Sequence, residues 1–571
     1  MNLNGRGVSF QRPLSRRRFL GVGGAALTSV ALAPLLAACG GDSTSTSISS
    51  NGTAASGGSQ ASPAVTGNDT PRKGGTIVVG SIQEPDSLNP WLSGLVVAYE
   101  VQNMIYDPLT RVDPNGNHVP ALAKEVPSLD NGGISADLTT YTYTLRDDVL
   151  WHDGTPFTAD DVVFTYQAIA DPSVNAISRL GFDLIESVSA VDAHTVEFKL
   201  NGPSGTFLET WGYRAILPKH KFEGQDMNTT ELNRAPTVGT GPYKFVRWAT
   251  GDRIVVERND SYYREGAYLD GITYLIVPNS DTLLTMLQTE EIDMRFVLSA
   301  EHVAIAKGYT DYDVLSTPAH SYFHITINLN DPVLSDKRVR QALTYGINKT
   351  EITETVLKDL VKPHWSPVAE PSWAFWDPTE KMAFNTDKAK QLLDQAGWVA
   401  KGSGVREKDG QKLSLDLMNI SGDSERLQVA QLLQATLKDI GVQVNIKPVD
   451  AATFVAASSS GDFQWAYGFW SWSVDPSTYN DRWLSTSPSN WTKYSNPDVD
   501  RLLLDATETI DRDERKKLYT QFQQTVIDDV SNIYIYDRVF FDTVKHRVQN
   551  FVQNPSNATN MWNVHEWWVR S

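Results

Sequence analysis

Residues 412–450 contain the pattern that most restricts the fold, a strand, a helix and a second strand in direct succession. "KLSLDLMNI" alternates the apolar residues Leu413, Leu415 and Leu417, which predicts a strand. "RLQVAQLLQATLKDIG" then places apolar residues at helical spacing and stops at Gly441, and "VQVNIKPVD" alternates again. The strands of such a βαβ unit pair in parallel through a right-handed crossover. The chain is therefore predicted to have an α/β fold.

Other segments continue this alternation of strands and helices. "TIVVGS" predicts a strand, "DDVVFTYQAIA" predicts a helix with a capping box formed by Thr158 and Asp161, and "FQWAYGFW" (463–470) predicts a further strand of the same sheet. In open α/β sheets, ligands bind outside the carboxyl ends of the strands. "IQEPDSLNPW" (82–91) and "WSWSVDPSTYND" (470–481) follow two such ends. We expect these two edges to face each other across a cleft between two lobes.

Length and charge restrict the architecture and the partners. A chain of 571 residues is too long for one hydrophobic core, so two or more lobes are expected. The first 38 residues contain five arginines and no acid; removing their charge from the total of −18 leaves −23 on the other 533 residues. So acidic a body repels phosphate backbones and anionic lipid, which excludes nucleic acid as a partner. No later segment has the roughly 20 uninterrupted apolar residues that a membrane span needs.

The N-terminus combines three features of an export signal. Arg16, Arg17 and Arg18 form a basic patch, the apolar run at 21–36 is too short to span a bilayer, and small residues lead into Cys39, the single cysteine. "SRRRFLG" resembles the twin-arginine export signal, and "LAAC" resembles the lipobox of bacterial lipoproteins. The resemblance implies cleavage before Cys39 and a lipid on its sulfur. The alternatives are a chance cysteine in an ordinary signal and a free buried thiol.

The stretch after Cys39 fits an anchor. Of the 33 residues from 40 to 72, 27 are Gly, Ser, Thr, Ala, Asn or Pro. Because so few residues are apolar, the segment cannot build a hydrophobic core. We therefore predict a signal peptide over 1–38 and a disordered tether over 39–73, with a span of roughly 30 Å. The body is expected outside the cytoplasm, on the periplasmic or cell-surface side. It would be attached to the cell membrane through the lipid alone.

Several longer motifs resemble one known family. They occur in the order "GGTIVVGSIQEPDSLNPW", "TYTYTLRDDVLWHDGTPFTADDVVFTY", "VGTGPYKFVRWATGDRIVVERNDSYY", "SDKRVRQALTYGINK" and "TDKAKQLLDQAGW", followed by the "DP" after "FWSWSV". The set is similar to the family 5 extracellular solute-binding proteins of bacterial ABC importers, the peptide- and nickel-binding group. The similarity runs from about residue 74 to near the C-terminus, and the order of the motifs makes it specific.

The resemblance implies a periplasmic-binding-protein type II fold, with two hinged lobes and an extra subdomain in the N-terminal lobe. The first lobe would comprise 74–108, 236–318 and the C-terminal return 533–571, the extra subdomain 109–235, and the second lobe 319–532. A small solute would bind between the lobes as they close. The closed form would then deliver it to the permease and ATPase subunits of the importer. The resemblance also implies a monomer that is not an enzyme and carries no cofactor.

Trp470, Trp472 and Asp475 are the first candidate ligand residues. On an alternating strand the two indoles point the same way and could stack on a peptide side chain or on a sugar ring; the alternative is that they pack the lobe core. In peptide-binding relatives, an aspartate three residues before the "DP" aspartate pairs with the ligand's ammonium, and this position is Trp472 here. Binding of peptides with a free amino terminus is therefore in doubt, and a sugar or a blocked or cyclic peptide is favoured. Asp475 could take the place of that aspartate, or it could stabilise the turn beside Pro476.

Five further candidates come from loops. A Pro-rich loop places Trp373 and Trp376 shortly after Trp365, where they could contact ligand or pack against the neighbouring lobe. Glu84 and Asn89 follow the first strand and could offer polar contacts or serve as caps. The ten histidines show no metal-binding spacing such as H-E-x-x-H, so no metal site is expected, although nickel carried by a chelator stays open.

Three other functions compete with that of an import receptor. An oligosaccharide-binding member of the same family is the nearest alternative. A secreted hydrolase with paired carboxylates is disfavoured, because no motif singles out one pair among 68 acids. A surface adhesion or sensory protein that reuses the binding fold leaves no local signature in the sequence.

Overall fold

The computed structural model describes residues 70–570, apart from residues 180, 213, 379–381, 403 and 557–559. The export signal with Arg16 and Arg17, the lipid-attachment candidate Cys39 and nearly all of the predicted tether lie outside the described residues. Within the described part of the chain, no helix is both long and apolar enough to cross a membrane.

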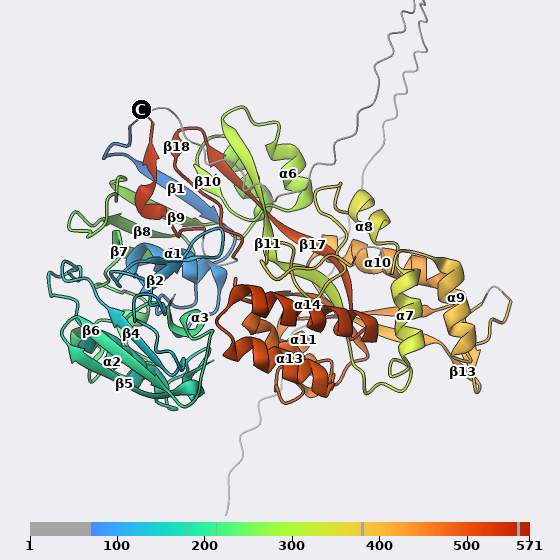
Figure 1. Ribbon diagram of the computed structural model, residues 1–571. Coiled ribbons are helices and arrows are strands. Elements are labelled where there is room, and N and C mark those ends of the chain that lie inside the picture. Colours follow the sequence, from blue (N-terminus) through green and yellow to red (C-terminus); the bar gives the residue numbers. More distant parts are fainter. Residues whose placement is uncertain are drawn as a thin grey trace, which may run out of the picture. The chain divides into compact units, whose positions relative to one another are not determined.

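One mixed sheet of ten strands organises the described residues (Figure 1). In spatial order its strands are β15 (Gln443–Val449), β14 (Ser414–Ile420), β16 (Trp465–Ser471), β11 (Tyr312–Ile327), β17 (Asn532–Lys545), β10 (Met294–Arg295), β1 (Thr76–Ser81), β9 (Gly271–Ile276), β8 (Arg253–Arg258) and β7 (Tyr243–Ala249). Small sheets are formed by β2 (Thr110–Val112) with β3 (His118–Pro120), by β4 (Thr140–Thr144), β6 (Thr195–Leu200) and β5 (Ile185–Asp192), by β12 (Glu407–Lys408) with β13 (Gln411–Lys412), and by β18 (Val548–Gln549) with β19 (Trp568–Val569).

Helices pack against these sheets. They are α1 (Val96–Ile105), α2 (Ala159–Ala170), α3 (Leu208–Trp211), α4 (Lys219–Phe222), α5 (Ser280–Gln288), α6 (Ala300–Ala306), α7 (Lys337–Gly346), α8 (Lys349–Thr355), α9 (Thr386–Gln395), α10 (Ser424–Lys438), α11 (Ala451–Ser460), α12 (Asn480–Trp483), α13 (Pro497–Glu508) and α14 (Arg512–Asp529). Short 3₁₀ turns occupy Phe182–Leu184, Glu231–Asn233, Pro476–Tyr479 and Val564–Glu566.

The predicted βαβ unit is confirmed. β14 pairs in parallel with β15 and also with β16, the further strand expected from "FQWAYGFW". Leu413, Leu415 and Leu417 are fully buried, because alternation directs them into the core. The connecting helix α10 ends at Lys438, and Gly441 adopts φ +84°, a left-handed conformation that suits glycine after a helix.

The local predictions in the first part of the chain are also confirmed. β1 covers the six residues of "TIVVGS" and pairs in parallel with β9 and β10. Helix α2 begins after Thr158, whose backbone N donates to Asp161 Oδ2 at 3.0 Å, as the capping box requires.

Separate hydrophobic cores form at the two ends of the large sheet. One core joins β1, β9 and α1 to the small sheet β4–β6–β5, and another joins β14, β15 and β16 to α7, α9 and α10. We call residues 74–318 and 533–570 the first lobe and residues 319–532 the second lobe, the ranges expected from the sequence. Two cores of this kind are the physical basis of two lobes; the individual boundaries stay predictions.

β11 and β17 pair with each other in antiparallel fashion and connect the two cores (Figure 1). Val544 of β17 lies in the first core, whereas Ile533, Ile535 and Tyr536 of the same strand lie in the second, beyond the boundary expected at residue 533. The register of the two strands shifts between Pro318 and Tyr322, at the expected boundary between residues 318 and 319. A bulge locally disrupts the ladder and bends the strand. The irregularity therefore lies where the chain first passes from one lobe to the other.

Candidate ligand-binding site

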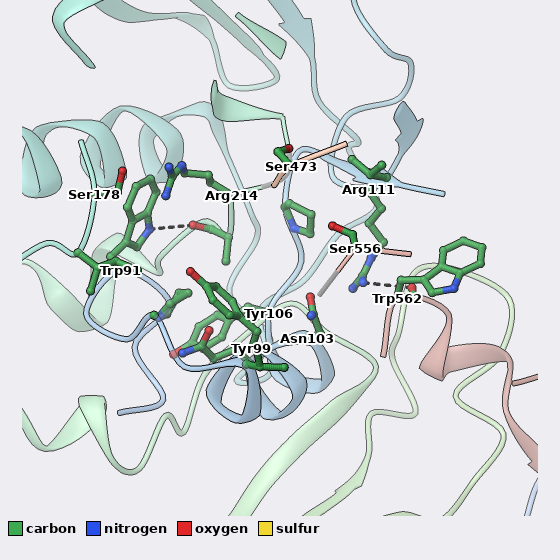
Figure 2. Close-up of a pocket in the computed structure, with 18 of the residues that line it drawn as sticks. Trp91, Tyr99, Asn103, Tyr106, Arg111, Ser178, Arg214, Ser473, Ser556 and Trp562 are labelled. Atoms are coloured by element: carbon green, nitrogen blue, oxygen red, sulfur yellow. Dashed lines mark hydrogen bonds between the residues drawn. The ribbon is translucent and has the colours of Figure 1, made fainter. Parts of the chain in front are cut away.

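A cavity of about 370 Å³ lies between the two lobes (Figure 2). Its lining from the second lobe is the run Ser471–Val474, at the carboxyl end of β16. The first lobe supplies most of the wall, including Pro90, Trp91, Gly94, Val96, Tyr99, Gln102, Asn103, Tyr106, Pro108, Arg111, Val112, Ile177, Ser178, Arg214, Ala215, Ser556 and Trp562. Both stretches predicted at strand ends, 82–91 and 470–481, thus contribute to one cavity.

Helix α1 forms one wall through side chains spaced by about one helical turn. Tyr99, Gln102, Asn103 and Tyr106 lie in or directly after the helix at the spacing i, i+3, i+4 and i+7, which places them on one face. Figure 2 shows Tyr99, Asn103 and Tyr106 close together on this wall. These residues were not singled out from the sequence. A polar and aromatic stripe at helical spacing, directly after a strand end, is the signal that could have found them.

A neighbouring side of α1 buries an acid. Glu100 is 4% exposed and accepts a hydrogen bond from the Tyr274 hydroxyl at 2.5 Å. Burial raises the pKa of Glu100 from its ordinary 4.5 to about 8, the hydrogen bond from Tyr274 opposes the rise, and the nearby charge of Asp542 adds to it. The cavity wall is therefore backed by a carboxyl group that is largely protonated near neutral pH.

Two guanidinium groups reach the cavity. Arg111 on β2 donates through Nε to Asp107 Oδ1 at 3.0 Å and through a terminal nitrogen to the Trp562 carbonyl at 3.2 Å. Burial alone would lower the pKa of Arg111, but the charge of Asp107, the hydrogen bond to it and the nearby Tyr262 and Tyr263 together outweigh burial and raise this pKa. Arg214 lies over the ring of Trp91, with its guanidinium carbon 5.0 Å from the ring centroid. The Trp91 indole is held in turn by its Nε1, which donates to the Ala215 carbonyl at 3.0 Å.

Of the residues predicted from the sequence as ligand contacts, Trp472 lines the cavity. Its ring is 4.5 Å from that of Tyr479 and 5.6 Å from that of Trp470, so it also belongs to the aromatic core of the second lobe. Its backbone N donates to the His320 carbonyl at 2.8 Å, which attaches the segment after β16 to β11. Trp472 thus stands where the core meets the cavity.

Trp470 packs more deeply than Trp472. Its ring lies 4.0 Å from that of His324 and 5.6 Å from that of Trp483, and its side chain is absent from the cavity lining that the described residues define. These contacts are those of an indole that packs in the core of the lobe. A direct contact of Trp470 with ligand stays a prediction.

Asp475 is buried and paired within its own lobe. Its Oδ1 lies 2.5 Å from an Arg515 terminal nitrogen and accepts from the Ser477 backbone N at 2.8 Å. The carboxylate therefore balances a buried guanidinium and caps the 3₁₀ turn that begins at Pro476.

The three loop tryptophans pack within the second lobe, to which their loop belongs. The Lys349 ammonium lies over Trp365, 3.5 Å from the centroid of the indole ring. Trp373 lies beside Tyr519, and the centroids of their rings are 5.9 Å apart. The backbone N of Trp376 donates to Gln523 at 3.0 Å. The described residues place none of these three in the cavity lining.

Glu84 and Asn89 make contacts within the first lobe and are absent from the described cavity lining. Glu84 accepts from the Trp248 indole N at 2.7 Å and from the Gly251 backbone N at 3.1 Å. Asn89 is fully buried and its side-chain oxygen accepts from the Trp91 backbone N at 3.0 Å. Asn89 therefore helps position an indole that lines the cavity.

No group of three or more His, Cys, Asp or Glu side chains within the described residues is arranged to hold a metal ion. Trp472 and its cavity neighbours offer aromatic faces, hydroxyls, amides and guanidinium groups. Such a set binds an organic solute by stacking and hydrogen bonding.

Comparisons with known proteins agree with this arrangement. The sequence profile described as "Bacterial extracellular solute-binding proteins, family 5 Middle" matches residues 117–491. The oligopeptide-binding protein AppA of Bacillus subtilis (strain 168) is 30% identical over 504 residues, 86% of this chain and 91% of AppA. Its solved structure, in complex with a nonapeptide, aligns with a TM-score of 0.75 at 30% identity and covers 88% of this chain and 100% of that one.

A solved relative with a different cargo is also similar. NikZ from Campylobacter jejuni, in complex with Ni(L-His), aligns with a TM-score of 0.74 at 27% identity, covering 86% of this chain and 99% of that one. Similar proteins in this set therefore carry peptides in one case and a nickel chelate in another.

Proposed function

The chain belongs to family 5 of the bacterial extracellular solute-binding proteins, the peptide- and nickel-binding group of ABC importers, and on this premise we propose that it captures a small organic solute between its lobes. The cavity between Ser471–Val474 and the first lobe is the observation that carries the proposal. The captured solute would be a peptide or a similar molecule. The protein would deliver this solute to the membrane permeases of an ABC importer, whose ATPase subunits power transport.

The family is made up of solute-binding proteins, which are not enzymes, and its members are extracytoplasmic or periplasmic. We further propose that this chain is exported through its twin-arginine signal and is attached to the cell membrane through Cys39. A lipid at the end of a flexible tether would keep the body close to the permease without restricting how it docks.

Closure provides the mechanism of capture. Ligand contacts to Trp472 and to the α1 wall exist together only when the lobes are shut, so ligand shifts the population toward the closed form. The permease can then distinguish loaded protein from empty protein by shape. Release would follow when the importer stabilises the open form.

The size of the cavity favours a small ligand. At about 370 Å³ it lies near the lower end of ligand pockets, roughly 300–1,000 Å³. A short peptide or a small sugar fits that range better than the nonapeptide held by the AppA relative. An oligosaccharide is the second candidate, because Trp91 and Trp472 both line the cavity and indoles stack well on sugar rings.

Thermal-shift screening tests the proposal. Purified protein is scanned against short peptides, oligosaccharides and metal chelates, and a true ligand raises the melting temperature as its concentration exceeds Kd. A hit is confirmed by tryptophan fluorescence and recovered unchanged by mass spectrometry. Recovery of hydrolysed products would instead indicate an enzyme.

The anchor has its own test. Cys39→Ala should move the protein from the membrane fraction to the soluble fraction of cells, because no lipid can be attached. Cys39→Ser serves as a second variant of similar size. Membrane association that survives both substitutions would contradict the lipid anchor.

A further inference from the structure

The charges that line the cavity are of one sign. Among the described residues of its wall, Arg111 and Arg214 are the charged side chains, and no carboxylate is present. Arg111 is balanced by Asp107, to which it is paired. Arg214 lies over Trp91 at the cavity wall, on a part of the first lobe that faces Ser471–Val474 of the second.

A wall of this kind discriminates between ligand charges. A ligand ammonium that enters it loses water and meets side chains of the same sign, which is unfavourable without a counter-charge. A ligand carboxylate meets guanidinium groups, whose planar fork matches carboxylate geometry. The described lining from the second lobe, Ser471–Val474, contains no carboxylate, so nothing in it offsets this preference.

Two buried polar groups of the α1 wall add directional requirements. The Tyr106 side chain is 1% exposed and Gln102 is 3% exposed, and both line the cavity. Neither the Tyr106 hydroxyl nor the Gln102 side-chain oxygen has a hydrogen-bond partner among the described residues. A buried polar group without a partner is costly, so each is suited to a ligand atom. The Gln102 oxygen needs a donor, such as an amide N–H or a hydroxyl, and the Tyr106 hydroxyl can donate to an oxygen.

We propose that the ligand is a small acidic solute without a free ammonium group, with its carboxylate directed to Arg214, a neutral N–H or O–H donor at Gln102, and its apolar part against Trp472. This inference rests on the proposed capture function and names the chemical class of its solute. An N-blocked short peptide and an acidic sugar share this chemistry.

Matched solutes test the assignment. N-acetyl dipeptides with a free carboxylate are compared with their C-terminal amides and with the corresponding free-amine amides. A disaccharide with a uronic acid is compared with its neutral counterpart. Dissociation constants are measured by calorimetry for each solute that raises the melting temperature.

We expect the acid of a pair to bind at least tenfold more tightly than its amide or neutral partner, and the free amine to bind worst. Whether the acetylated acid or the uronic acid binds shows whether the site prefers an N-blocked peptide or an acidic sugar.

Variants assign the preference to a residue. Arg214→Gln should remove the difference between acid and amide, and Arg214→Lys, which keeps the positive charge, should retain part of it. Arg234→Gln is the matched control, because Arg234 lies over Trp248 at 4.0 Å outside the described cavity lining. This control should leave both affinities unchanged.

The outcomes separate the inference from the proposed function. Amides that bind as tightly as acids, free amines that bind best, or an acid preference that survives Arg214→Gln would overturn the inference while capture itself stands. If no solute of any charge raises the melting temperature, the capture function fails as well.

Discussion

At the scale of single residues, Trp472 both lines the cavity and packs in the aromatic core of the second lobe, so substitution can distinguish the two roles. Trp472→Phe should weaken binding of the best solute at least about fivefold, ~1 kcal/mol, because the indole contributes part of the cavity wall. Trp483→Phe is the matched control: the ring of Trp483 lies 5.6 Å from that of Trp472 in the same cluster, but Trp483 is absent from the described cavity lining. Calorimetry gives the affinity and urea unfolding gives the stability. Equal losses of affinity in both variants would show that the indole acts through the core.

Asp475 is a second residue whose role depends on its surroundings. Asp475→Asn should lower the free energy of unfolding by about 3–5 kcal/mol, since it leaves Arg515 buried without its counter-charge. Asp147→Asn, which breaks the exposed pair with Lys124, should change stability very little. Urea denaturation measures both. A small effect of Asp475→Asn on stability, together with a large loss of affinity, would instead return Asp475 to the ligand site.

At the scale of elements, helix α1 couples the cavity wall to a buried acid. The pKa of Glu100 is raised in the folded protein to about 8, so the folded state binds its proton more tightly than the unfolded state does. The resulting stability is complete below the ordinary pKa of 4.5 and is lost as the pH rises through about 8. Between pH 6.5 and 8.5, wild-type protein should therefore lose stability with a slope of at most about 1.4 kcal/mol per pH unit.

Glu100→Gln isolates this contribution, because it keeps an oxygen acceptor for Tyr274 but has no proton to lose. Urea unfolding at half-unit pH steps should give a flatter slope for the variant than for wild type. The window lies above the pKa of Asp542, which burial raises to about 6, so that group contributes little to the difference. Parallel slopes for the two proteins would contradict the assignment.

At the scale of the whole molecule, the proposed closure depends on contacts between the lobes. The backbone N of Gly205 in the first lobe donates to the Thr507 carbonyl in the second at 2.8 Å, and Ile510 of the second lobe packs against the first-lobe core. A Cβ on Gly205 would lie 2.3 Å from the Thr509 carbonyl oxygen, a backbone atom that cannot rotate away. Closure therefore requires a residue without a side chain at this point.

Gly205→Ala should favour the open form and lower affinity about tenfold, ~1.4 kcal/mol, because the closed form now contains a clash. Small-angle scattering should show a larger radius of gyration at saturating ligand. Gly202→Ala is the control in the same loop, since a Cβ there meets nothing within 4 Å. If Gly205→Ala binds as wild type does, the contact is incidental to closure.

The sequence by itself determined what depends on local periodicity. The alternation at Leu413, Leu415 and Leu417, and the helical spacing that follows, predicted β14, α10 and β15, because each pattern has one face to bury. The ordered motifs indicated the family, and the end of β16 placed Trp472 near a ligand-facing edge. These inferences needed only neighbours along the chain.

The tertiary structure alone decided which side chains meet. Asp475 pairs with Arg515 forty residues away, and Trp91 is covered by Arg214 from a distant loop. The polar stripe of α1 becomes a cavity wall only because Ser471–Val474 of the second lobe lies opposite it. Periodicity specifies the face that an element buries but not its partner, so the charge and the shape of the site emerge only when distant segments pack together.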